Sequence, residues 1–197
     1  DADITVGCAP LTVTFNNLTT GGASCVWNFG TGATSAGCGT QTFTYSSPGI
    51  FNVSLMITDA AGCTYTNTLL DYINVNDEPH ASFQPDQYIL DDLDTEVEFT
   101  NNSTGASSYE WQFGDGSALT TIENPSHFFP TQGQNSTYVV SLIATNGNAC
   151  TDTAQVVITV QDIIIFYVPN VFTPDGDDFN EIFQPVFVSG YDPYDFH

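Results

Sequence analysis

Hydrophobic and polar residues alternate along several short segments of this chain. Residues 11–17 and 95–101 each place a valine and a phenylalanine at alternate positions between polar side chains. A period of two puts successive side chains on opposite faces, which is the pattern of a half-buried β-strand. The same period returns in residues 51–57, 138–144 and 156–160. Because glycine-rich turns separate these segments, the pattern predicts an all-β fold of short strands.

The strands belong to an internal repeat. Residues 11–17 align with 95–101, and Trp27-Asn-Phe-Gly-Thr-Gly32 aligns with Trp111-Gln-Phe-Gly-Asp-Gly116, both at an offset of 84 residues. Later in each copy the offset is 87, so that Cys63 corresponds to Cys150. Self-similarity over this length indicates tandem copies of one structural unit. The number and spacing of strands predict a β-sandwich in each copy.

The tryptophan of each copy is expected on a central strand as a core anchor. The Gly-x-Gly that follows it has no helical pattern behind it, so it is interpreted as a tight turn and not as a phosphate-binding loop. We interpret Asp115 as a turn former, because Asp-Gly is a favoured turn pair. We expect His127 to pack on the sandwich.

The motif Trp-x-Phe-Gly-Asp-Gly, with Phe-x-Asn upstream and Pro-Ser-His-x-Phe downstream, resembles the PKD (polycystic kidney disease) domain. The second copy matches closely, whereas the first has Thr31 in place of the usual aspartate. The resemblance implies tandem immunoglobulin-like sandwiches, over residues 1–76 and 77–161. It also implies a spacer, stalk or interaction module of an extracellular protein.

Residues 162–197 follow a different pattern. Their segment Pro169-Asn-Val-Phe-Thr-Pro-Asp-Gly-Asp-Asp-Phe-Asn-Glu-Ile-Phe183 resembles the start of the gliding-motility-associated C-terminal domain of Bacteroidetes, the type B sorting domain of the type IX secretion system. The segment departs from that family at Asp175, Asp178 and Glu181. The resemblance implies a third, partial β-sandwich-like domain, export across the outer membrane, and an outer-membrane β-barrel as partner. We expect the chain to be a piece of a longer one.

Five cysteines are present, and four of them lie in the first 63 residues. The CxxC spacing of zinc sites is absent, which favours disulfides and an oxidising compartment. Cys8 precedes the second strand and Cys63 lies in the turn before the last strand of its copy, so the pair Cys8–Cys63 is expected. Cys25 begins the tryptophan strand and Cys38 lies across the next hairpin, so Cys25–Cys38 is the second expected pair. Cys150 is then left as a free thiol.

The chain carries 23 acidic residues and no lysine or arginine. Nucleic acid and anionic membrane surfaces are therefore excluded as partners, because both require basic side chains. No segment reaches the ~20 apolar residues that a membrane-spanning helix needs. Mutual repulsion between the acidic groups makes divalent cations the first ligand to consider.

One acidic loop could bind calcium, since this hard cation prefers six to eight oxygen ligands. Its candidate ligands are Asp175, Asp177, Asp178, Asn180 and Glu181. A solvated acidic turn explains the same residues equally well. The linker Asn76-Asp77-Glu78 is a weaker candidate, for which an ordinary polar linker is the simpler interpretation.

Catalytic patterns are absent from the sequence, because the three histidines fit neither a Ser–His–Asp order nor a zinc motif. Asp152-Thr153-Ala154 resembles the O-glycosylation motif of Bacteroidetes, which makes Thr153 a candidate glycan site. The expected function is a non-catalytic stalk and export region of a large gliding or attachment adhesin that contacts an external surface or polysaccharide. The alternatives are the accessory end of a secreted polysaccharide- or protein-degrading enzyme, and direct carbohydrate binding through aromatic residues such as Tyr109.

Overall fold

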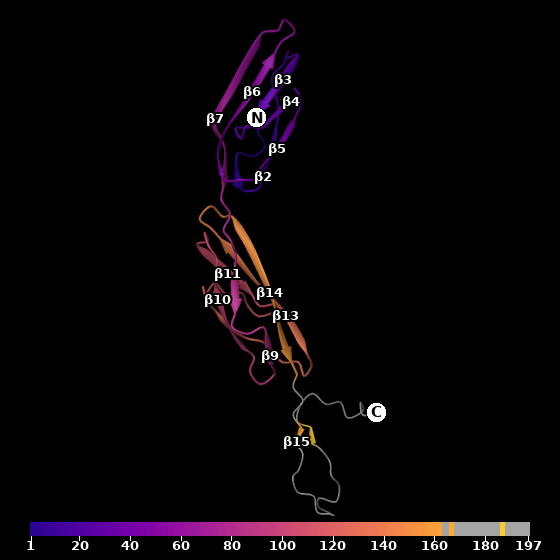
Figure 1. Cartoon of the computed structure of the whole chain (residues 1–197), viewed down its shortest axis with the longest axis vertical. Helices are drawn as coiled ribbons and strands as arrows, with labels where there is room; N and C mark the ends of the chain where they lie inside the picture. The colour runs from indigo at the N-terminus through magenta and orange to yellow at the C-terminus, as the bar shows by residue number, and fades with distance from the viewer. Residues whose placement is uncertain (163–165, 168–185, 188–197) are drawn as a thin grey trace, which may run out of the picture. The chain divides into compact units, whose positions relative to one another are not determined.

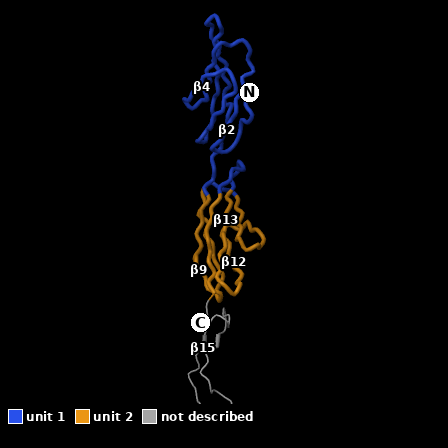
Figure 2. Tube along the Cα trace, turned by 90° about the vertical axis from the view of Figure 1, so that its right-hand side faces the viewer, with its two compact units in different colours: residues 1–80, 105–107, 145–152 blue, residues 81–104, 108–144, 153–197 orange. Residues whose placement is uncertain are grey.

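The computed structural model describes residues 1–162, 166–167 and 186–187. All sixteen elements in this part of the chain are β-strands, and they form two compact units (Figures 1 and 2). Unit 1 comprises residues 1–80, 105–107 and 145–152, and unit 2 comprises the remaining residues. The all-β prediction is therefore confirmed.

Unit 1 contains a five-stranded sheet in the order β1-β7-β6-β3-β4 and a two-stranded sheet of β2 and β5. The five strands of the larger sheet are β1 (Val6–Cys8), β7 (Thr64–Asn76), β6 (Gly49–Thr58), β3 (Ser24–Asn28) and β4 (Thr34–Ala36). The smaller sheet pairs β2 (Leu11–Phe15) antiparallel with β5 (Gln41–Tyr45).

The core of unit 1 follows from the alternation in the sequence. Val13 and Phe15 of β2 are 0% and 1% exposed, while Thr12, which precedes Val13, is exposed. Trp27 of β3 is also buried, with its ring centroid 5.8 Å from that of Phe15. Burying each such side chain stabilises the fold by about 1.5–3 kcal/mol. The expected role of Trp27 as a core anchor is confirmed.

Repeat 2 contributes a three-stranded sheet, β12-β10-β8, and a four-stranded sheet, β11-β13-β14-β9. The first comprises β12 (Ser126–Phe128), β10 (Glu96–Asn101) and β8 (Phe83–Pro85). The second comprises β11 (Ser108–Gln112), β13 (Ser136–Thr145), β14 (Thr151–Gln161) and β9 (Ile89–Asp91). Trp111 is fully buried in this core, with its ring 5.6 Å from that of Phe99.

Each repeat also contains a parallel strand pair that the alternation does not reveal. β1 runs parallel to the end of β7, with Cys8 opposite Asn76, and β9 runs parallel to the end of β14. An early strand of each repeat, β1 or β9, therefore lies beside the last strand of that repeat. In the chain beyond Asp162, the structure describes two short strands that pair antiparallel, β15 (Phe166–Tyr167) and β16 (Val186–Phe187).

The Gly-x-Gly motif forms a turn in both repeats. Gly30, Gly32, Gly114 and Gly116 have φ between 79° and 89°, a region that L-residues rarely adopt. A Cβ added to Gly114 would lie 2.5 Å from the Val139 carbonyl oxygen in β13. The glycine thus allows close approach of two protein backbones, as the interpretation of a tight turn requires.

Candidate functional site

The disulfide between Cys25 and Cys38 is present in the structure, as expected from the sequence. The Cα atoms are 4.9 Å apart, and the Gly37 amide donates a hydrogen bond of 2.9 Å to the Cys25 carbonyl. Asn17 Nδ2 donates to the Cys38 carbonyl at 3.1 Å. The disulfide therefore closes the β3–β4 hairpin, and the hydrogen bond from Asn17 connects this hairpin to the segment after β2.

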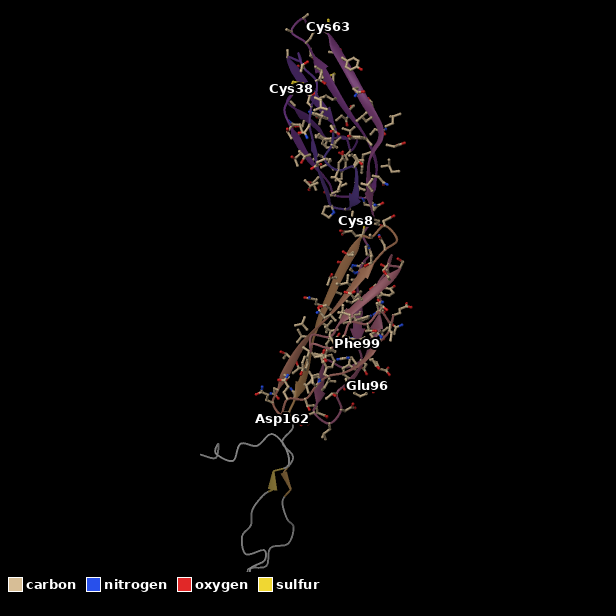
Figure 3. All side chains as sticks on the ribbon, turned by 180° about the vertical axis from the view of Figure 1, so that it is seen from behind. Cys8, Cys38, Cys63, Glu96, Phe99 and Asp162 are labelled. Atoms are coloured by element: carbon tan, nitrogen blue, oxygen red, sulfur yellow. A yellow bond between two sulfur atoms is a disulfide. The ribbon has the colours of Figure 1, made fainter. Side chains whose placement is uncertain are left out.

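The other expected pair, Cys8–Cys63, is wrong, and so is the expectation that Cys150 is free. Cys8 is bonded to Cys150, with the Cα atoms 5.7 Å apart, and Cys63 is an exposed free cysteine. Cys8 lies opposite Asn76 at one end of β7, whereas Cys63 directly precedes Thr64 at the other end. Thirteen residues of strand span roughly 40 Å, and a disulfide needs Cα atoms less than about 7 Å apart. Figure 3 labels Cys8 and Cys63 at opposite ends of the first repeat.

The Cys8–Cys150 bond lies inside unit 1, which includes residues 145–152. Asn146 shapes the loop before Cys150, because its Oδ1 accepts hydrogen bonds from the amides of Asn148 and Cys150. Its Nδ2 donates to the Asp77 carbonyl at 2.8 Å. His80 Nδ1 lies 3.6 Å from Asp152 Oδ2 in the same region. The disulfide is thus accompanied by polar contacts from both sequence repeats.

The second feature whose side chains could take part in chemistry is the pair Asp115 and His127. Their Oδ2 and Nε2 atoms are 2.7 Å apart, and the two side chains are 5% and 16% exposed. The imidazole stacks on the Phe113 ring, with centroids 3.9 Å apart. Ser117 donates to Asp115 Oδ1 through its hydroxyl at 2.6 Å and its amide at 3.0 Å. Asp115 is therefore both a turn former, as expected, and the centre of a small polar network.

This network holds Asp115 ionised. Burial raises the pKa of its carboxyl, but the hydrogen bonds from Ser117 and His127 outweigh burial and lower the pKa to about 2. Because an ionised carboxylate can only accept hydrogen bonds, His127 Nε2 carries the hydrogen that it shares with Asp115.

The arrangement differs from that of a catalytic triad. In a triad the histidine lies between the serine and the carboxylate. Here the carboxylate lies between Ser117 and His127, so that the imidazole does not contact the hydroxyl that it would have to activate. The expected packing of His127 on the sandwich is observed, whereas its bond to Asp115 was not predicted.

The first repeat shows that the polar pair is replaceable. The counterparts of Asp115 and His127 at an offset of 84 are Thr31 and Phe43. Phe43 stacks on Phe29 with ring centroids 4.5 Å apart, which matches the stacking of His127 in the other repeat. Two repeats thus fill the same place with either an aromatic pair or an aromatic–imidazole pair, and the shared role is packing.

The family model described as PKD domain matches the chain twice, over residues 1–75 and 76–160. Together these matches cover most of the 197 residues. The chain belongs to the PKD domain family. Its two PKD domains are tandem immunoglobulin-like β-sandwiches.

Several solved structures are similar to this PKD chain. The PKD1 domain of the Vibrio cholerae metalloprotease PrtV is 26% identical and covers 43% of this chain and 98% of its own, with a TM-score of 0.36. The PKD1 domain of Vibrio anguillarum Epp is also 26% identical and covers 45% and 99%, with a TM-score of 0.37. A structure from a 1.5-MDa bacterial ice-binding adhesin is 13% identical and covers 82% and 62%, with a TM-score of 0.34. No curated protein matches the chain.

The location of the PKD domains follows from their cysteine chemistry. Two disulfides in the described part of the chain indicate an oxidising, extracellular environment. Tandem PKD domains are typical of extracellular adhesins and of the accessory modules of secreted enzymes. Among the residues that the structure describes, none form a helix of the length and hydrophobicity needed to cross a bilayer.

The remaining sequence candidates have different outcomes. Asp175, Asp177, Asp178, Asn180 and Glu181 lie outside the described residues. Within residues 1–162, no three histidine, cysteine or acidic side chains are grouped as a metal site, and this range includes the linker at Asn76 to Glu78. Thr153 is exposed on β14, which a glycan acceptor requires. Tyr109 is half-buried against the core of its PKD domain and is not an exposed platform for a sugar.

Proposed function

We propose that this chain is a non-catalytic stalk region of a large cell-surface adhesin. The observation that carries the proposal is the tandem PKD pair, in which the tryptophans and glycines of the repeated motif serve cores and turns. Trp27 and Trp111 are buried, and Gly30 and Gly114 allow backbone contact. A stalk needs only folded spacers of this kind.

The surroundings of the two described histidines and of one pocket favour a non-catalytic role. Asp115 and His127 are engaged with each other and with Ser117 and Phe113 in packing. His80 is the other described histidine, and its side chain is 77% exposed beside Asp152. A hollow next to Trp27 is lined mainly by apolar and amide side chains, and its ionisable groups are Asp1 and Tyr72. In none of these places does a histidine contact a hydroxyl or thiol that it could activate.

The charge of the chain suits an exposed surface protein. With 23 acidic residues and no lysine or arginine, it gives proteases of trypsin specificity no cleavage site. The same charge disfavours nucleic acid and anionic lipid as partners. An external surface or polysaccharide is the proposed target of the adhesin, contacted by a part of the parent protein other than the described residues.

Residues 162–197 are proposed to be part of a type IX export signal, recognised by an outer-membrane component of that system. The support is the similarity of residues 169–183 to the type B sorting domain. The test is antibody labelling of the parent protein on intact cells. We expect labelling to fall at least tenfold when residues 162–197 are deleted and when the secretion barrel is absent. Unchanged labelling in both strains would contradict the proposed export route.

The coding sequence on the amino-terminal side of the parent decides between the two stalk roles. Further repeats would support the adhesin. A catalytic domain would contradict it and favour the accessory region of a secreted enzyme.

Calcium binding by the acidic loop is a separate proposal. Its candidate ligands, including Asp177 and Asp178, supply the carboxylate oxygens that Ca²⁺ prefers. Millimolar Ca²⁺ should raise the melting temperature of the parent chain relative to chelator, and the variant D177N/D178N should lose this shift. Equal melting temperatures with Ca²⁺ and with chelator would remove the proposed site.

A further inference from the structure

Cys63 and Cys150 occupy the same place in the two PKD domains. Each ends a five-residue loop whose first residue, Asp59 or Asn146, accepts hydrogen bonds from two later amides through its side chain. In both loops the first amide donates to the carbonyl of the cysteine at 3.0 Å. The residue before each cysteine has positive φ, 86° at Gly62 and 61° at Ala149. The backbone therefore presents both cysteines in the same way.

Their bonding differs. Cys150 is 1% exposed and bonded to Cys8, whereas Cys63 is exposed and free. Cys150 shows the partner that one cysteine at this loop position takes, namely Cys8 on the first strand of the other repeat. The second repeat has Asp92 at the position of Cys8, so it can supply only the loop cysteine.

The cysteines within this chain cannot supply the partner of Cys63. Cys8 is bonded to Cys150 and lies at the far end of β7, and Cys25 is bonded to Cys38. We propose that Cys63 forms a disulfide with the cysteine at the Cys8 position of another PKD repeat. A second copy of this chain is not the expected partner, because its Cys8 is already engaged.

The surroundings of Cys63 define what the partner repeat must present. Asp59 replaces Asn146, so a carboxylate stands where Nδ2 of Asn146 donates to the Asp77 carbonyl. The partner should therefore offer a hydrogen-bond donor there in place of that carbonyl. Tyr65 stands at the position of Asp152 and is 67% exposed, which gives the partner an apolar ring to cover.

The reaction is thiol–disulfide exchange with a low-molecular-weight disulfide such as oxidised glutathione. The Cys63 thiolate attacks one glutathione sulfur, forms a mixed disulfide and releases the first glutathione thiol. The partner thiolate then attacks the Cys63 sulfur and releases the second. Two protein thiols are oxidised, and one glutathione disulfide is reduced to two glutathiones.

The experiment uses the unmodified chain of 197 residues, which offers the Cys63 thiol. Its reaction partner is a mass-tagged C63S/C150S chain, the probe, which offers the Cys8 thiol. The two are mixed at equal concentration in a glutathione redox buffer, and the covalent dimers are counted by mass. Each chain alone reports the dimers Cys63–Cys63 and Cys8–Cys8. In the matched control, a C63S/T64C chain replaces the unmodified chain. These two substitutions move the exposed thiol by one residue, to the other face of β7.

We expect the Cys63–Cys8 dimer to exceed its statistical share at least about tenfold, and the C63S/T64C chain to show no such preference. A statistical mixture would overturn the proposal. Equal enrichment of the dimers that Cys8 forms with Cys63 and with the C63S/T64C control would also overturn the proposal. Such a result would mean that Cys8 reacts without regard to the position of the thiol, as it would in an unfolded probe. If the unmodified chain alone formed dimers in which Cys63 of one copy had replaced Cys150 as the partner of Cys8 in another copy, the assignment of the partner to a separate repeat would be overturned.

Discussion

Replacing Gly114 by alanine tests the physical basis of the motif turn. The new Cβ would lie 2.5 Å from the carbonyl oxygen and 2.9 Å from the nitrogen of Val139, both backbone atoms of β13. Real Cβ atoms do not approach backbone so closely, so the turn or the strand must shift. Gly116 is the matched control, because its φ is 84° against 79° for Gly114 but a Cβ there has no atom within 4 Å.

The two variants therefore separate backbone strain from steric overlap. Alanine at positive φ costs about 1 kcal/mol at either position. Overlap with a strand that cannot collapse adds about 1–3 kcal/mol at Gly114 alone. The expected loss of stability is about 2–4 kcal/mol for G114A and about 1 kcal/mol for G116A.

Native-state amide hydrogen exchange, measured on peptic peptides, resolves this difference within one repeat. Peptides from β13 should lose roughly tenfold or more additional protection in G114A than in G116A, since 1.4 kcal/mol is a factor of ten. The corresponding β6 peptides of the first repeat serve as an internal reference. Equal loss of protection in the two variants would refute the claim that Gly114 is required for backbone contact.

Three further predictions concern the disulfide and the polar network. Removing the Cys25–Cys38 bond in C25S/C38S should lower the free energy of unfolding, measured by urea denaturation, by about 3 kcal/mol. The reason is that the bond closes a loop between cysteines 13 residues apart and so restricts the unfolded chain. An unchanged midpoint and slope would contradict this. The wild-type chain should lose about 1–2 kcal/mol of stability as the pH falls from about 4 through about 2, because the pKa of Asp115 is lowered to about 2 when folded and its ionised form is the stabilising one. In D115N the part of this loss that Asp115 causes should be absent, so stability should fall less steeply with acid than in the wild type, and a D115N profile parallel to that of the wild type would count against the network. The variant D115T/H127F gives the second repeat the side chains of the first and should remain within about 1 kcal/mol of the wild type, whereas H127A should be clearly less stable by thermal unfolding.

The sequence predicted the secondary structure and cores well because both depend on local periodicity. Val13 and Phe15, like Tyr138 and Val140, are buried at alternate positions as the pattern requires. The agreement is incomplete for Leu55 in β6, which is only half-buried. The smaller sheet of that repeat has only two strands, and alternation alone does not report how much of a face the opposite sheet covers.

The disulfide pairing could not be predicted in the same way. Cys8 and Cys63 both lie next to strand ends, and the sequence does not show which ends meet. The parallel pairing that places Cys8 opposite Asn76 decides this and is a non-local property of strand order. The repeat alignment contained a usable signal, namely that Cys150 has no Cys8 counterpart in its own repeat. That absence leaves Cys150 without a partner inside its own repeat, and it equally allows a partner in the neighbouring repeat.

The Asp115–His127 bond was missed for a related reason. Asp115 belongs to the turn and His127 lies twelve residues later, and only the pairing of β10 with β12 brings the histidine beside the turn. The sequence signal was the joint replacement of both residues by Thr31 and Phe43 in the first repeat. Paired replacement between internal repeats is thus a guide to contacts.

The central claim is that this chain is a pair of extracellular PKD domains whose cysteines join across the repeats. Its most direct test is disulfide mapping of this chain on its own, with no further PKD repeat present, after secretion into an oxidising compartment. Free thiols are alkylated without reduction, and the chain is digested with pepsin, because trypsin has no lysine or arginine to cut. We predict one alkylated residue, Cys63, and a linked peptide pair containing Cys8 and Cys150. A peptide pair linking Cys8 to Cys63, with Cys150 alkylated, would contradict the account.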